Sequence, residues 1–253
     1  MRQESESTVA TDTDRRLLLK TAAAGIGAAL VATPMVGAQE QAVTVQVRGE
    51  AFAQTHQPKP LPFNSSSLDG LSQRLIDSHW ANNYGGSVRA LNETKRRLAD
   101  ALADRDLPAY IYNDLKREHL MRTGSVVLHE LYFDNLGGNG RADAAAQRLL
   151  ASAFGEFGRW EAEFRRIANG LGGGSGWVIL GYNSQFGTLE NYWMADHLHN
   201  PAATVPLLVM DMYEHSYHMD FGSAAGQYVD AFFNNINWEQ VLTRMEALRL
   251  SAA

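Results

Sequence analysis

Cysteine is absent from this chain of 253 residues, and its absence removes several classes of protein at once. Without a thiol there is no disulfide framework, no thiolate-bound metal and no cysteine nucleophile. Positive charge is also scarce, because 22 lysines and arginines stand against 28 acidic residues, for a formal net charge of −6. An acidic chain has no electrostatic attraction to nucleic acid or to an anionic membrane surface, so we expect neither as a partner.

The chain also lacks a long uninterrupted apolar run. Its apolar N-terminal stretch, 21–36, is interrupted by two glycines and a proline. Because a spanning helix needs about 20 mainly apolar residues, we expect no stable membrane insertion. The pair Arg15-Arg16 before this stretch and the small residues 36–38 after it are typical of a twin-arginine export signal with its cleavage site. We therefore expect residues 1–38 to be a cleaved signal peptide, and the mature protein to be periplasmic or secreted.

Prolines are few, and the hydrophobic share of 45% is that of a globular protein with ample core for one large domain or two small ones. Residues 39–60 have no clear helical period and indicate a linker or an N-terminal arm. Apolar periodicity and turn residues then predict the remaining elements. Helices are expected from about 68 to 102, at 110–136, 144–154, 157–168 and 227–248, and strands at 177–182, 188–193 and 205–213.

Three local features refine this scheme. The serines at 65–67 are N-cap residues for a helix beginning near Leu68. Gly85-Gly86 predicts a bend or close packing in that helix, and the basic run 95–97 predicts a solvated helix face. The glycine-rich segment 172–176 leads into a strand, not into a helix N-terminus, which argues against a phosphate-binding loop.

Helices precede the glycine-rich turn at 137–140, and strands with further helices follow it. The expected class is α+β, with an N-terminal helical hairpin domain at 61–138. The expected C-terminal domain, 139–253, holds a three-stranded antiparallel sheet and helices.

Asp211 and His215, at the end of an apolar run, are a pair of potential metal ligands. Carboxylate and imidazole are ordinary ligands of first-row metals. A strand followed by a turn could bring the two together, and so could one face of a helix. The pair alone is more often a surface or cap feature. However, His79 and His129 lie on the apolar faces of two predicted helices, where a histidine is either a satisfied core residue or a ligand.

The region 61–248 resembles the iron/manganese superoxide dismutase family. The matching residues follow the family's order and include both upstream histidines. They are Leu61-Pro62-Phe63, His79, His129 with Asn135-Leu136, Gly174-Ser175-Gly176-Trp177, Leu180-Gly181-Tyr182-Asn183, Asp211 with Glu214-His215, and Asn237-Trp238-Glu239.

The resemblance implies a single Fe or Mn ion held by His79, His129, Asp211 and His215. It also implies disproportionation of superoxide to O2 and H2O2 as the metal cycles between +3 and +2, with Asp211 accepting a hydrogen bond from metal-bound solvent. Ligand identity does not separate Fe from Mn.

The residues around the ligands depart from the family pattern. The family's glutamine near the bound solvent falls on Ser125 or on His197, and we expect His197 to be the redox-tuning donor. The gateway tyrosine becomes Ser87, while Trp177 matches and Tyr213 replaces another pocket tryptophan.

Charge and assembly residues are altered as well. The family's two entrance cations map to Asn82 and Ala225, so weaker steering of anions is expected. The gateway histidine becomes Asn83, and its tyrosine partner across the dimer interface becomes His218. The resemblance implies a homodimer, or a tetramer built from it, in which Glu214 bonds a ligand histidine of the partner. The altered gateway leaves open another small-molecule redox reaction, such as peroxide chemistry, or a non-catalytic metal-binding protein.

Overall fold

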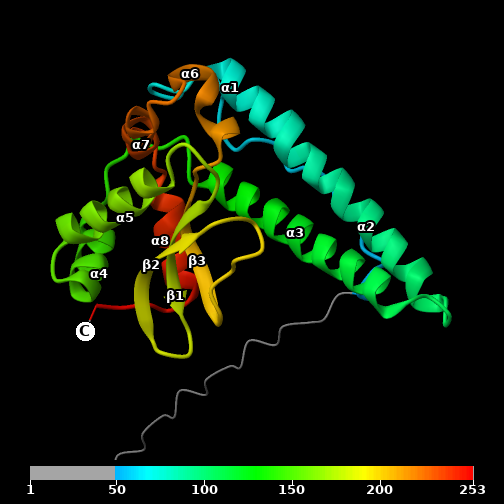
Figure 1. Cartoon of the computed structure of the whole chain (residues 1–253). Coiled ribbons are helices and arrows are strands. Elements are labelled where there is room, and N and C mark those ends of the chain that lie inside the picture. Colours follow the sequence, from blue (N-terminus) through cyan, green and yellow to red (C-terminus); the bar gives the residue numbers. More distant parts are fainter. Residues whose placement is uncertain (1–48, 253) are drawn as a thin grey trace, which may run out of the picture. The chain divides into compact units, whose positions relative to one another are not determined.

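A computed structural model of the chain describes residues 49–252 (Figure 1). The predicted signal peptide and residues 39–48 of the predicted arm lie outside this part. None of the helices in the described part is long and apolar enough to cross a membrane.

The helical elements are α1 (Gln73–Ser78), the π-helix η1 (His79–Tyr84), α2 (Gly85–Ala103), α3 (Ala109–Asp134), α4 (Ala144–Phe154), α5 (Phe157–Leu171), the 3-10 helix η2 (Glu214–Ser216), α6 (His218–Phe221), α7 (Ala225–Asn234) and α8 (Trp238–Ala247). The strands are β1 (Trp177–Asn183), β2 (Thr188–Met194) and β3 (Thr204–Asp211).

The helical hairpin consists of α1, η1 and α2, followed by α3, which packs along α2 (Figure 1). The predicted start near Leu68, with capping serines at 65–67, is wrong. Gly70 has a positive φ of 78°, which a helix does not allow, and α1 begins after it. The cap is Ser72, whose side chain accepts a hydrogen bond from the main-chain N–H of Leu75 at 3.1 Å.

A π-helical turn separates α1 from α2. The N–H of Gly85 reaches the main-chain oxygen of Trp80, five residues back, which is the π pattern. One residue is thereby added to the turn that follows His79. The glycines 85–86 lie directly after this turn and begin α2, and the π-helix itself was not predicted. Such turns are frequent at functional sites.

The end of the predicted arm packs against the hairpin. Asn92 clamps the main chain of His56, donating to its oxygen at 2.9 Å and accepting from its N–H at 2.8 Å. Lys95 is 5% exposed, and its Nζ donates to the main-chain oxygen of Gln54 at 2.8 Å. The prediction that the run 95–97 is a solvated face is therefore wrong for Lys95, because the arm covers it. The neighbouring Arg96 and Arg97 are exposed.

The sheet has the order β2-β1-β3, with both pairs antiparallel. The central strand β1 is buried over nearly its whole length, as its continuous apolar run predicts. Helices α3 and α8 pack against β3, and α5 packs against β1 and β2. Strand β3 thus ends beside α3, and this places the carboxylate of Asp211 next to the helical hairpin.

The single C-terminal helix predicted at 227–248 is two helices. The break at 235–237 occurs because its main chain pairs with the turn after α3. Gly138 N–H donates to Asn235 O and Asn237 N–H donates to Asn135 O, at 3.1 and 2.7 Å. Asn237 then caps α8, accepting from the N–H of Gln240. A β-carbon at Gly138 would overlap the main chain at Ile236, so glycine is required there.

Candidate metal centre

Asp211 is the last residue of β3, and its side chain is held in one orientation. Its Oδ1 accepts a hydrogen bond from the main-chain N–H of Tyr213 at 2.8 Å. Its main-chain oxygen accepts one from the hydroxyl of Tyr228 at 2.7 Å. Oδ2 is left to face the histidines. His215 follows in η2 with Nε2 3.2 Å from Oδ2. Of the two arrangements that the D-x-x-x-H spacing allows, the chain adopts the strand followed by a turn.

His79 and His129 complete the group from the hairpin. Nε2 of His79, in the π-helix, lies 3.2 Å from Oδ2 of Asp211, and Nε2 of His129, in α3, lies 3.6 Å from it. Nδ1 of His129 donates to the main-chain oxygen of Ser125 at 2.7 Å, so the neutral ring presents an unprotonated Nε2. One ligand atom from each of these four side chains, His79, His129, Asp211 and His215, lies within 4.8 Å of the others. We call these four side chains the ligand group.

These atoms lack the partners that buried polar groups ordinarily have. Among the described residues, both ring nitrogens of His79 and Nε2 of His129 are buried without a hydrogen bond. Leaving such atoms unsatisfied costs roughly 1–3 kcal/mol each, so their persistence points to a ligand. Two atoms each about 2.1 Å from a metal lie roughly 3.0–3.6 Å apart when they subtend 90–120°. The three distances to Oδ2 fit that spacing.

Protonation states also suit a cation. Burial lowers the pKa of His129 to about 3 and lowers that of His79, so both rings are neutral at physiological pH. Burial alone would raise the pKa of Asp211, but the adjacent His215 and His79 outweigh it and hold that pKa well below its usual range. An ionised carboxylate beside neutral imidazoles is an N/O donor set for a first-row divalent or trivalent metal.

Aromatic rings and His197 enclose one side of the group. The indole N–H of Trp177 donates to Nδ1 of His197 at 3.0 Å, so the neutral His197 ring carries its proton on Nε2. The ring of Tyr213 stacks on His197 and on His215, with centroids 4.7 and 5.2 Å apart. Trp177 meets His129 edge-on at 5.2 Å.

Several further predicted residues line a hollow of about 520 Å³ beside the histidines. Ser87 and Ser125 share a hydrogen bond of 2.7 Å across the hairpin, and Ser125 Oγ lies 3.3 Å from Nδ1 of His129. Asn82 and Asn83 also line the hollow. The structure therefore brings together Asn83, Ser87, His197, Tyr213 and the ligand group, with Trp177 directly behind them.

The surroundings of Tyr213 and His197 keep both of these rings uncharged. Burial raises the pKa of Tyr213 to about 12. Burial also lowers the pKa of His197; Asp211 and Asp196 work against that shift, while His215 and Arg122 add to it. His197 and Tyr213 are therefore hydrogen-bonding groups at neutral pH and carry no formal charge.

Other sequence-predicted residues lie elsewhere. Ala225, at the start of α7, is buried against Gly172 and does not line the hollow. Glu214 and His218 are exposed on the described chain. The cross-interface contacts expected of them involve a partner and stay predictions.

Sequence reasoning missed three contributors. Arg122 lines the hollow, Tyr228 holds the main chain of Asp211, and Gly124 lies against the main chain of His197. A signal existed for Arg122, because it precedes His129 by seven residues and two helical turns bring it to the same face. Tyr228 and Gly124 gave none, since their partners are distant in sequence.

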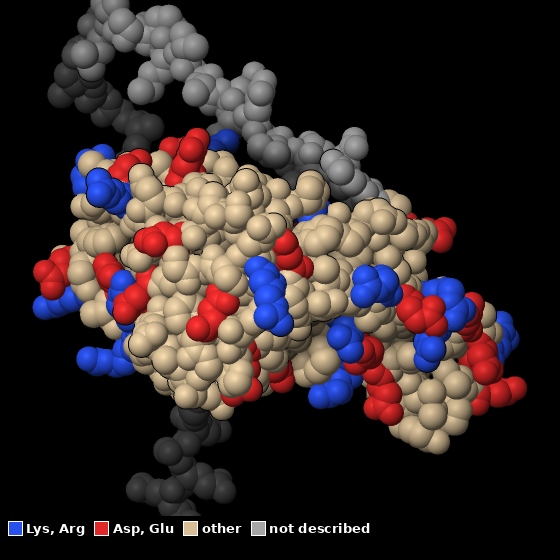
Figure 2. All heavy atoms as spheres, turned by 90° about the horizontal axis from the view of Figure 1, so that it is seen from above, with Lys and Arg blue, Asp and Glu red and all other residues tan. Residues whose placement is uncertain are grey.

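The face shown in Figure 2 has basic and acidic side chains interspersed, with uncharged surface between them. No region of this view gathers charge of one sign.

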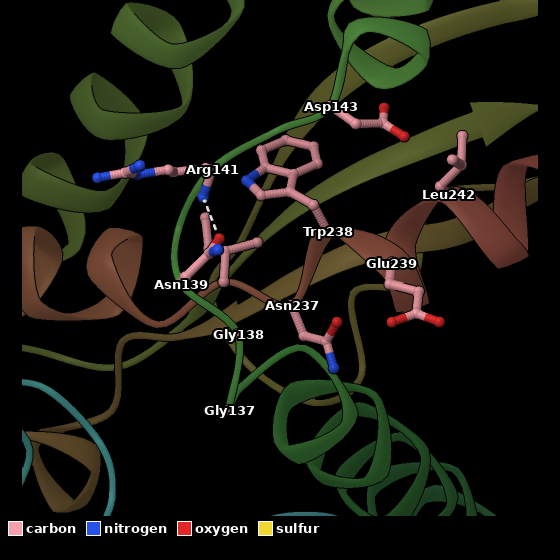
Figure 3. A pocket seen from close by; sticks show the side chains of 10 residues that line it. Gly137, Gly138, Asn139, Arg141, Asp143, Asn237, Trp238, Glu239 and Leu242 are labelled. Atoms are coloured by element: carbon pink, nitrogen blue, oxygen red, sulfur yellow. Dashed lines mark hydrogen bonds between the residues drawn. The ribbon is translucent and has the colours of Figure 1, made fainter.

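A second hollow, of about 400 Å³, lies at the turn after α3 (Figure 3). It holds Arg141, Asp143, Glu239 and Trp238, and the N–H of Arg141 donates to the side chain of Asn139 at 3.0 Å. Among the described residues that line it there is no histidine. This hollow and the hollow beside the ligand group have no lining residue in common. It reflects the packing of the turn on 235–237 and offers no imidazole ligands.

Comparisons with known proteins agree with this geometry. Residues 142–244 match the family described as iron/manganese superoxide dismutases, C-terminal domain. The chain is 48% identical over 192 residues to the superoxide dismutase [Fe] of Cupriavidus metallidurans, covering 76% of this chain and 97% of that protein. It is 36% identical over 187 residues to that of Aquifex pyrophilus, covering 71% and 86%. It is 32% identical over 181 residues to the superoxide dismutase [Mn] of Mycolicibacterium smegmatis, covering 70% and 86%. Because the chain covers most of the length of each of these relatives at 32–48% identity, it belongs to the iron/manganese superoxide dismutase family.

Proposed function

We propose that this protein is a superoxide dismutase that disproportionates superoxide to O2 and H2O2 with one Fe or Mn ion per chain. The ion is held by His79, His129, Asp211 and His215. The observation that carries the proposal is the convergence of these four donors, with buried nitrogens that no described protein group satisfies. Relatives are named for either metal, which supports Fe and Mn alike as the cofactor.

When bound, the metal supplies one-electron chemistry by alternating between its +3 and +2 states. The protein's contribution is to fix the donors. Tyr213 N–H holds Oδ1 of Asp211, so Oδ2 alone faces the histidines. The main-chain oxygen of Ser125 holds Nδ1–H of His129, so Nε2 alone faces the carboxylate. Partners that orient a ligand in this way raise metal affinity about 10–100-fold.

Protons must also reach the site, because two superoxide anions and two protons give one O2 and one H2O2. His197 presents Nε2–H as a donor, since Trp177 occupies Nδ1. The hydroxyls of Ser87 and Ser125 form a second hydrogen-bonded pair at the same hollow. Either hydroxyl of this pair can donate, so the pair can pass a proton in either direction. Tyr213 keeps its own proton and orders His197 by stacking.

The test is metal analysis combined with a direct superoxide assay on the purified protein, reconstituted separately with Fe and with Mn. About one metal per chain and superoxide removal well above the free-ion rate are expected with at least one of them. Asp211→Asn keeps the shape of the side chain but removes the charge, so it is expected to lose metal and activity together. Asp100→Asn, at an exposed position of α2, is the matched control and should behave as wild type. A fully metallated protein that leaves superoxide untouched would refute the proposal.

We also propose that the protein is exported and dimeric. Residues 1–38 have the pattern of a twin-arginine signal, which carries folded proteins and therefore suits a metal loaded before export. The mature chain would then be an arm at 39–60, a helical domain at 61–138 and an α/β domain at 139–253. Exposure of Glu214 and His218 beside the ligand group supports their use in contacts between two copies of the chain.

A further inference from the structure

One cation stands at the hollow beside the ligand group. Among the described residues that line it, Arg122 is the one lysine, arginine, aspartate or glutamate. The other lining groups are amides, hydroxyls, imidazoles, a phenol and small residues. Since the whole chain has a net charge of −6, Arg122 is the one lining side chain with a permanent positive charge to add to the attraction that the proposed metal exerts on an anion.

Arg122 lies on α3 two turns before His129, which places it on the helix face that carries the ligand. Its side chain is 33% exposed, so it reaches both solvent and hollow. Nε donates to Oε1 of Glu118, one turn earlier on α3, at 2.6 Å. That bond uses one of the five N–H groups of the guanidinium and directs its orientation. Glu118 also offsets part of its charge.

We infer that Arg122 draws the anionic substrate into the hollow and that Glu118 tempers this attraction. The inference rests on the proposed function, because superoxide is a monoanion. It assigns the steering charge to a helix different from those that carry Asn82 and Ala225. Of these two positions, Asn82 is uncharged and Ala225 lies away from the hollow. The steering expected to be weak from the sequence is therefore supplied by α3.

Azide is the probe, because it is a small monoanion whose binding to the metal-loaded protein is measured by optical titration without turnover. Arg122→Gln is expected to raise the azide Kd on the order of two- to tenfold, and Glu118→Gln to lower it by a smaller factor. Arg122→Lys keeps the charge and should stay near wild type. The rate constant for superoxide should change in the same directions, with less dependence on ionic strength in Arg122→Gln.

Arg159→Gln is the matched control, because it makes the same change of net charge at an exposed position of α5 outside the hollow. Its azide Kd should equal that of wild type. An unchanged Kd in Arg122→Gln, or a weakening in both Arg122→Gln and Glu118→Gln, would overturn the inference. If Arg122→Gln failed to fold, the azide Kd of Glu118→Gln would be the test, with a lower Kd supporting the inference and an unchanged or higher Kd overturning it. A protein that binds azide but leaves superoxide untouched would refute the dismutase proposal without touching the role of Arg122.

Discussion

Gly124 and His197 lie against each other so closely that a β-carbon at position 124 would overlap the main-chain oxygen of His197. Gly124 is in the middle of α3, where glycine is otherwise unfavourable by roughly 0.5–1 kcal/mol relative to alanine. The cost is offset by the contact that it permits. With no side chain on α3 at this point, the loop after β2 comes down onto the helix and brings the His197 ring to the ligand group.

We therefore predict that Gly124→Ala displaces His197 while leaving the four metal ligands in place. Metal content should stay near one per chain, superoxide activity should fall, and Tm should drop, because overpacking costs about 1–3 kcal/mol. Quenching or spectral change of Trp177 fluorescence would report loss of its bond to His197. Gly158→Ala, in α5 with open space around it, should be neutral or stabilising. Unchanged activity in Gly124→Ala would show that the loop position is immaterial.

The second prediction concerns metal retention. His129→Ala removes a buried donor whose Nε2 has no described hydrogen-bond partner. Metal content is expected to fall at least about tenfold, since loss of an outer partner alone typically costs 10–100-fold in metal affinity or activity. His199→Ala removes a histidine whose side chain is 56% exposed and should keep its metal. Elemental analysis after dialysis decides the point, and a fully loaded His129→Ala protein would mean that the ligand set is wrong.

The sequence predicted most elements because their apolar periods are long and consistent. The strands, α3, α4 and α5 were expected within a few residues of their bounds, and the family resemblance named the four side chains that the structure brings together. The π-helix escaped prediction because spacing by four from His79 to Asn83 and Ser87 fits an α-helix equally well. Only the extra main-chain residue in the turn distinguishes the two.

Three further differences share one physical cause, which is contact between segments distant in sequence. The sequence pattern places Lys95 on the exposed face of an amphipathic helix, whereas in the structure the arm covers it. The sequence between α7 and α8 is compatible with a continuous helix, but the main chain at 235–237 pairs with the turn after α3 and breaks it. The spacing of Arg122 from His129 gives a helix face, but the hollow that Arg122 lines forms only where α3 meets the loop after β2. Local propensity contains none of these contacts.

The third prediction is a pH dependence of stability at the arm. The pKa of His56 is lowered from its ordinary 6.5, by burial first and then by the charge of Lys95, against a smaller opposing effect of Glu130. Lys95 Nζ lies 3.1 Å from Nε2 of His56 and can only donate, so the folded state favours the neutral ring. The unfolded chain thus binds more protons below pH 6.5. This contribution is complete above that pH and is lost as the pH falls below it.

Thermal unfolding followed from pH 7.5 to 5.5 should therefore show a smaller fall of Tm in His56→Gln than in wild type. The substitution keeps the main-chain clamp of Asn92, which depends on no side-chain atom of residue 56. Asn92→Ala breaks the clamp and should lower Tm by a similar amount at every pH. Identical slopes in wild type and His56→Gln would contradict the assignment.

The fourth prediction concerns export. Replacing Arg15-Arg16 by Lys-Lys should leave the precursor inside the cell, because the arginine pair is the recognised feature of the proposed signal. Cell fractionation with immunoblotting gives the readout. The same replacement at Arg96-Arg97, an exposed pair on α2, is the matched control and should be exported normally. Normal export of the Arg15-Arg16 variant would show that residues 1–38 are not a twin-arginine signal.

The last prediction concerns assembly at Glu214. Its carboxylate is exposed on the described chain although it directly precedes the proposed ligand His215. In a two-fold dimer an isologous contact occurs twice, so a bond from Glu214 to His215 of the partner would join both metal sites. A carboxylate on a ligand imidazole also fixes its tautomer and raises its basicity.

Glu214→Ala should therefore weaken association and metal binding together, with a loss of metal affinity of about 10–100-fold. Sedimentation velocity across a micromolar concentration series and elemental analysis of the same samples test both effects. Glu246→Ala, at an exposed position of α8, removes the same charge away from the ligands and should change neither. Glu214 is exposed in a single chain, so the alternative is that its carboxylate is solvated and contacts no partner. In that case Glu214→Ala would have wild-type assembly and metal content. A wild-type protein that sediments as a monomer at micromolar concentration with its metal intact would rule out the dimer, and with it the expected contact of His218 with Asn83 of the partner.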